Sequence, residues 1–117
     1  MPRMPSPETV LSQLCATLEA RKKADASSSY VAGLYAKGLD AILKKIGEEA
    51  GETLIAAKNG SAPALTHELA DLWFHCLVLM AQQNLPLSAV TDELARRFGK
   101  SGLEEKATRR KTGEDHG

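Results

Sequence analysis

The sequence has little of several features that would assign it to a familiar class. Two cysteines in 117 residues, Cys15 and Cys76, are too few for a disulfide framework or a four-cysteine zinc site, and both lie in apolar helical patterns typical of reduced core thiols. Fifteen basic and fifteen acidic residues give zero net charge. The sequence thus has neither the basic excess typical of nucleic-acid binding nor the acidic excess typical of disorder. No apolar run could span a bilayer, and the N-terminus lacks a signal-peptide pattern. These absences predict a cytoplasmic protein without nucleic-acid or membrane partners.

Helical periodicity is the main structural signal that is present. Neither strand alternation nor an internal repeat occurs, whereas apolar residues recur at helical spacing through most of the chain. The expected helices cover residues 6–21, 30–58 with a break near Gly38, 65–83 and 88–98. The length suits a single domain over residues 1–117, with 1–5 and 110–117 expected to be flexible. The sequence therefore predicts an all-α fold, a bundle of four to five helices.

The helix expected over residues 65–83 is apolar almost all round. Such a helix is buried in a core or an interface, and a chain of this size can hardly cover it on every side. We therefore expect a homodimer to complete the core, most simply with two-fold symmetry. Trp73 is expected in the core. The last helix is expected to turn Val90, Leu94 and Phe98 inward.

Five carboxylates stand in two short groups, Glu48, Glu49 and Glu52 before a glycine-serine-proline turn, and Glu68 and Asp71 after it. Glu49 and Glu52 are three residues apart, as are Glu68 and Asp71, so each pair shares one helix face. Two helices joined by a short turn are usually antiparallel neighbours, which would let the pairs face each other. An oxygen-only cage of this kind favours Mg²⁺ or Mn²⁺ over zinc and suits phosphate chemistry.

A plainer interpretation of the acidic residues is surface decoration. Lys44 and Lys45 each lie four residues before a glutamate, and such pairs are ordinary on a solvent-facing helix. Asp71, however, lies in a helix with almost no polar face, where an ionised carboxylate is costly unless it is paired or bound to metal. This favours a metal site. His75, four residues beyond Asp71, is more typical of a buried, hydrogen-bonded core histidine than of a ligand.

The motif GEEAGE…HELAD matches the ExxE…ExxD pattern of the all-α nucleotide pyrophosphohydrolases, the MazG-like and dimeric dUTPase-like group. Its frame is more specific. Residues 27–60, 67–87 and 96–109 (the last reading RRFGKSGLEEKATR) closely resemble the phosphoribosyl-ATP pyrophosphohydrolases of histidine biosynthesis. The resemblance covers roughly residues 10–109. Asp25-Ala26 stands where that family usually has Asp-Pro, a change in a loop.

The resemblance implies a MazG-like fold and hydrolysis of phosphoribosyl-ATP at the α–β phosphoanhydride, giving phosphoribosyl-AMP and pyrophosphate. It implies Mg²⁺ as the cofactor, with Mn²⁺ as a possible substitute. The implied metal ligands are Glu49, Glu52, Glu68 and Asp71. Glu48 and Glu49 are the candidate catalytic carboxylates, Glu48 as a ligand or as the general base for water. The candidate substrate contacts are Lys22, Ser28, Tyr30, Lys37, Lys44, Lys45, Lys58, Lys106 and Arg109.

Two other functions remain open at this point. One is a housecleaning pyrophosphohydrolase that uses the same cage on nucleoside triphosphates. The other is a non-catalytic helical dimerisation module, in which the carboxylates have no ligand.

Overall fold

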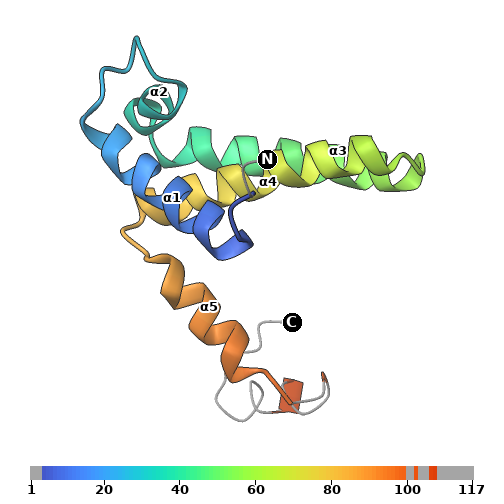
Figure 1. Ribbon diagram of the computed structural model, residues 1–117. Coiled ribbons are helices and arrows are strands. Elements are labelled where there is room, and N and C mark those ends of the chain that lie inside the picture. The colour runs from blue at the N-terminus through green and yellow to red at the C-terminus, as the bar shows by residue number, and fades with distance from the viewer. Residues whose placement is uncertain (1–3, 100–101, 103–105, 108–117) are drawn as a thin grey trace. The chain divides into compact units, whose positions relative to one another are not determined.

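A computed structural model describes residues 4–99, 102, 106 and 107. Five α-helices and one short 3-10 helix have determined bounds, and no strand occurs in the described part of the chain. They are α1 (Pro7–Ala20), η1 (Arg21–Lys23), α2 (Tyr30–Lys37), α3 (Leu39–Lys58), α4 (Ala62–Gln82) and α5 (Leu87–Arg96) (Figure 1). The predicted all-α fold is confirmed. Residues 1–3 and 110–117, expected to be flexible, lie outside the described residues.

Contacts divide the chain into two units, Met1–Leu87 and Ser88–Gly117. A single domain over residues 1–117 therefore stays a prediction. Among the described residues, every helix is too short or too polar to cross a membrane.

Serine side chains determine where three of the helices begin. Ser6 Oγ accepts a hydrogen bond from the Thr9 amide at 3.2 Å, and Ser61 Oγ accepts one from the Ala64 amide at 3.3 Å. Ser29 caps α2 in the same way. These bonds satisfy amides that have no partner within the helix, and a proline in the first turn of α1 and of α4 costs no hydrogen bond.

Gly38 separates α2 from α3, at the predicted break. Its φ of +97° lies in the region that glycine adopts far more readily than other residues. A Cβ at this position would meet nothing within 4 Å, so a substitution would cost backbone strain rather than a clash. The break lets α2 turn away while α3 continues as a straight partner for α4.

The first unit is built on the long α3–α4 hairpin, whose two helices run side by side (Figure 1). The helix α1 packs against α4, and α2 packs against α3. Leu18 from α1, Ile42 from α3 and Val78 from α4 are almost completely buried where these helices meet. The bundle predicted from helical periodicity is confirmed, with its core at one end of the hairpin rather than along its full length.

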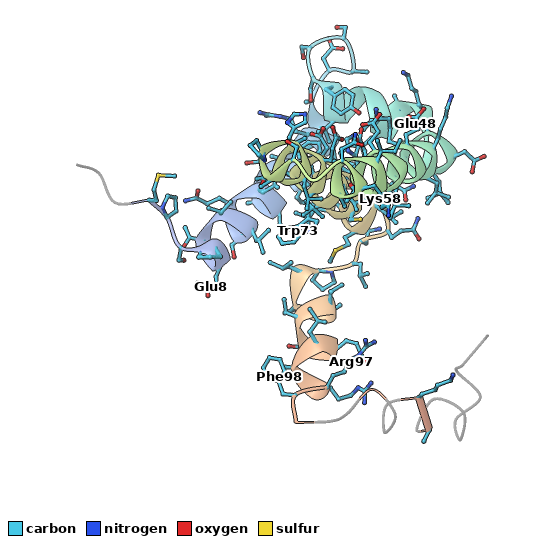
Figure 2. All side chains as sticks on the ribbon, turned by 90° about the vertical axis from the view of Figure 1, so that its right-hand side faces the viewer. Glu8, Glu48, Lys58, Trp73, Arg97 and Phe98 are labelled. Atoms are coloured by element: carbon cyan, nitrogen blue, oxygen red, sulfur yellow. The ribbon has the colours of Figure 1, made fainter. Side chains whose placement is uncertain are left out.

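Two predictions about apolar faces are wrong for the single chain. Trp73, expected in the core, is 60% exposed on α4 (labelled in Figure 2), because α3 and α1 cover other sides of that helix. Val90, Leu94 and Phe98, expected to face inward, are 40%, 51% and 80% exposed. All of α5 except Leu87 belongs to the second unit, and the described part of that unit holds no other element with determined bounds that could cover this face.

Ion pairs within the helix support α5. Glu93 accepts hydrogen bonds from Arg96 and from Arg97 Nε, the latter at 3.0 Å. These bonds lower the pKa of Glu93 to about 2. Because the folded pKa is depressed, the contribution of these pairs is present above the ordinary glutamate range and is lost as the pH falls toward 2. At this exposed site salt also screens the pairs.

Candidate metal centre

Three carboxylates meet across the α3–α4 hairpin. Oxygen atoms of Glu49, from α3, and of Glu68 and Asp71, from α4, all lie within 4.8 Å of one another. Glu68 and Asp71 are three residues apart and so share one face of α4, which the hairpin turns toward Glu49. The predicted convergence of the two acidic groups is therefore present in the structure, with these three residues as its members.

Two of the three residues, Glu49 and Glu68, have a buried carboxylate oxygen. Glu49 is 6% exposed, and within the described residues neither Glu49 Oε2 nor Glu68 Oε2 has a hydrogen-bond partner. Buried carboxylate oxygens without partners are costly unless a cation or proton compensates them. The side chain of Asp71 is 42% exposed and lies 3.3 Å from His67 Nε2. The expectation that Asp71 is the buried member is wrong, because it lies at the open edge of the group.

Lys45 supplies a positive charge beside the carboxylate group. Its Nζ is 3.4 Å from Glu49 Oε1 and 3.8 Å from Glu48 Oε1. The pKa of the Lys45 ammonium is raised, first by nearby Tyr30 and then by the two carboxylates, although burial acts in the opposite direction. One oxygen of Glu49 is thus paired in the way expected of surface decoration, while its second oxygen has no hydrogen-bond partner among the described residues.

Glu48 and Glu52 lie outside the close group. Both are exposed residues of α3, and Figure 2 labels Glu48. Glu52 is one turn from Glu49, toward the hairpin turn, and Glu48 is the residue that shares Lys45 with Glu49. The role of Glu48 as a catalytic carboxylate and the role of Glu52 as a metal ligand stay predictions.

His75 connects the carboxylate group to α2. It is 5% exposed, its Nδ1 lies 2.8 Å from the backbone oxygen of Asp71, and its Nε2 lies 2.8 Å from the Tyr30 hydroxyl. The prediction of a buried, hydrogen-bonded histidine is confirmed. The Tyr30 contact could not be read from the sequence, because nothing in the pattern pairs residues that lie 45 positions apart.

Two cavities flank the serine-rich loop that precedes α2. The first, of about 450 Å³, is lined by loop residues 26–29 and by α2, including Ser28, Tyr30 and Lys37. The second, of about 500 Å³, shares Ser28 and Tyr30 and is closed by Phe74 and Arg21, among others. Sequence reasoning missed Phe74 and Arg21, because the first lies in a long apolar run and the second suits the end of a helix.

A sequence model of the family described as "Phosphoribosyl-ATP pyrophosphohydrolase" matches residues 11–98. The chain belongs to this family. It is 61% identical over 101 residues to the phosphoribosyl-ATP pyrophosphatase of Methylococcus capsulatus, a match that covers 86% of this chain and 96% of that protein. It is 53% identical over 108 residues to the protein of the same name from Nitrosospira multiformis, covering 92% of this chain and 89% of that one.

The candidate substrate contacts of this family member are spread over several elements. Ser28, Tyr30 and Lys37 line the first cavity. Lys45 reaches the carboxylate group, as described above, while Lys44 is exposed on α3. Lys58, labelled in Figure 2, is exposed in the last turn of that helix.

The other three candidate basic residues are Lys22, Lys106 and Arg109. Lys22 is held by Glu19, at 3.0 Å, and donates a hydrogen bond to Asn84 at 2.9 Å, so it ties the end of α1 to the end of α4. Lys106 is exposed in the second unit, and Arg109 lies outside the described residues. Their roles in binding stay predictions.

Proposed function

We propose that this protein hydrolyses phosphoribosyl-ATP at the α–β phosphoanhydride and releases pyrophosphate and phosphoribosyl-AMP, the second step of histidine biosynthesis. The observation that carries this proposal is the partly buried carboxylate group on the α3–α4 hairpin of a member of this family. The names of the relatives support the same substrate.

The donor set fits a hard divalent cation, and we propose Mg²⁺, for which Mn²⁺ can substitute. Glu49, Glu68 and Asp71 would hold it, with Glu52 one turn away. The unpartnered oxygens of Glu49 and Glu68 support this assignment, since a cation would satisfy both. Bound there, the cation would neutralise charge on the phosphate oxygens of the substrate.

The protein's own residues would position the substrate and the water. Glu48, exposed beside the group, is our candidate for the base that takes a proton from the attacking water. Ser28, Tyr30 and Lys37 would bind the end of the substrate that enters the serine-loop cavity. Lys44, Lys45 and Lys58 would contact phosphates along α3. Lys22, Lys106 and Arg109 complete the set of candidate substrate contacts.

Pyrophosphate release from phosphoribosyl-ATP, measured with and without Mg²⁺, tests the proposal. We expect turnover that depends on the metal and that exceeds turnover of ATP, dCTP and dUTP under the same conditions. Faster hydrolysis of the nucleoside triphosphates would instead support the housecleaning pyrophosphohydrolase. No hydrolysis of any of the four, and no Mg²⁺-dependent change in melting temperature, would support the non-catalytic module.

We also propose that the protein is a homodimer. The hairpin leaves large apolar side chains exposed, with Leu54 at 68%, Ile55 at 62% and Trp73 at 60%. Such side chains, gathered on two long helices, are typical of an interface rather than of a monomer surface. Sedimentation equilibrium of the wild type is expected to give twice the chain mass.

Trp73→Glu is expected to weaken this dimer by at least about tenfold in Kd, because a buried interface tryptophan is commonly worth 2 kcal/mol or more. Gln13→Glu, which adds the same charge at an exposed position of α1, serves as the control and is expected to leave the mass unchanged. A monomeric wild type, or a Trp73→Glu variant as dimeric as the control, would contradict the proposal.

A further inference from the structure

The Tyr30–His75 contact lies between the two parts of the candidate site. His75 is almost buried, with its ring 5.3 Å from the Phe74 ring and 5.8 Å from the Tyr30 ring, both edge to face. Each ring nitrogen has one partner at 2.8 Å, the Asp71 backbone oxygen for Nδ1 and the Tyr30 hydroxyl for Nε2. The ring therefore has one orientation and two fixed hydrogen bonds.

The chemistry of these partners fixes the protons. A carbonyl oxygen only accepts, so Nδ1 must carry the hydrogen of that bond. In the neutral ring that carries this hydrogen on Nδ1, Nε2 has only its lone pair to offer. The Tyr30 hydroxyl must therefore donate to His75. Its single proton is used, and its oxygen can only accept a further hydrogen bond.

The residue that carries this hydroxyl lies beside space for a ligand. Tyr30 is 57% exposed and lines both cavities beside the serine loop. Tyr30 also interacts electrostatically with Lys45, whose Nζ lies 3.4 Å from Glu49 Oε1. A ligand that spans the carboxylate group and the serine loop would pass this oxygen.

We propose that His75 is a positioning residue that holds the Tyr30 hydroxyl as a pure hydrogen-bond acceptor, so that this oxygen receives a sugar hydroxyl of the ligand and disfavours a phosphate oxygen. An ionised phosphate oxygen is itself an acceptor and finds no proton there. His75 does not touch the ligand and acts through Tyr30. The inference rests on the proposed function, since it assigns the sugar end of that substrate to the serine-loop cavity.

The kinetic test uses phosphoribosyl-ATP and the full-length protein. Tyr30→Phe removes the acceptor and is expected to raise KM by on the order of tenfold with kcat changed less than twofold. The inhibition constant of inorganic pyrophosphate should stay the same, because phosphate oxygens do not bind at this position. Tyr35→Phe is the matched control on α2. Its hydroxyl donates to the Leu18 backbone oxygen, so its loss should lower the melting temperature and leave KM alone.

Substitutions of His75 separate its two hydrogen bonds. The amide of His75→Asn can reproduce the bond of Nδ1 but does not reach Tyr30. The Tyr30 oxygen then stays in place but is no longer fixed as an acceptor, so KM should rise by less than in Tyr30→Phe. Combining His75→Asn with Tyr30→Phe should raise KM no further than Tyr30→Phe alone, since His75 acts only through the Tyr30 hydroxyl. The longer His75→Gln can present an acceptor to Tyr30 and should recover most of the loss in KM. If His75 has only a structural role, both substitutions should lower the melting temperature and leave KM unchanged.

Nuclear magnetic resonance of the histidine ring nitrogens gives a readout that does not need activity. We expect the Nδ1–H form for His75 in the wild type. An Nε2–H ring would overturn the inference even if the enzyme is active, as would an unchanged KM in Tyr30→Phe. If the wild type does not hydrolyse phosphoribosyl-ATP, the proposed function fails. An Nδ1–H ring would then leave the positioning of Tyr30 supported and remove only the assignment of its ligand.

Discussion

Glu49→Gln is expected to lower kcat for pyrophosphate release by about a hundred- to a thousandfold, the usual loss when one preorganised electrostatic group is removed from a catalytic site. Glu49 is the most buried of the close carboxylates, and its Oε2 has no partner among the described residues. The substitution keeps the shape of the side chain and removes its charge. In the absence of metal it should leave stability unchanged or raise it, because it relieves repulsion with Glu68 and Asp71.

The melting temperature with and without Mg²⁺ distinguishes this loss from misfolding. At about a hundred times Kd, a ligand specific for the folded state stabilises it by about 2.7 kcal/mol, and Glu49→Gln should lose most of that gain. Glu19→Gln is the control, since Glu19 is an exposed residue of α1 that pairs with Lys22. Retention of both activity and the metal-dependent shift in Glu49→Gln would exclude this residue as a ligand.

Leu18→Ala is expected to have the largest effect on folding. Leu18 is 1% exposed and is the only buried residue of α1. Truncating such a side chain leaves a cavity and costs about 2–5 kcal/mol, a large part of the stability of a small protein. The melting temperature should fall by at least about 8 °C.

Thermal unfolding monitored by circular dichroism measures this effect. Gln13→Ala, at an exposed position of the same helix, is the matched control and should shift the melting temperature by no more than about 2 °C. If the two variants unfold together, α1 does not belong to the cooperative core.

The sequence predicted the helices well because the signals that begin and end them are local. Ser6 and Ser61 cap their helices, and Gly38 breaks the chain where its positive φ is needed. The acidic motif was equally readable, since i,i+3 spacing and a short turn bring Glu49 to the face of α4 that carries Glu68 and Asp71. These inferences need only helix periodicity and the tendency of a hairpin to be antiparallel.

Packing between segments that are distant in the sequence was harder to predict from the sequence. The apolar character of Trp73 and Phe98 indicated burial, but composition does not say whether the covering surface belongs to the same chain. The burial of Asp71 was also misjudged, since a helix that is apolar on average still has an exposed edge, and Asp71 lies on it. The Tyr30–His75 bond depends on the path of the serine loop, which no spacing rule predicts.

The position of the three carboxylates on the α3–α4 hairpin limits where the sequence can accept insertions and deletions. Glu49 precedes Asn59 by ten residues and Asp71 follows Ser61 by ten, so the two arms measure about 15 Å each at 1.5 Å per residue. One residue added within either helical arm would turn a carboxylate by about 100° and move it by about 1.5 Å, away from its partners. One residue added at Asn59–Ser61 would lengthen only the exposed turn. Insertions and deletions that keep the carboxylates together are therefore confined to the few residues at the tip of the hairpin. These residues lie far from the carboxylates themselves.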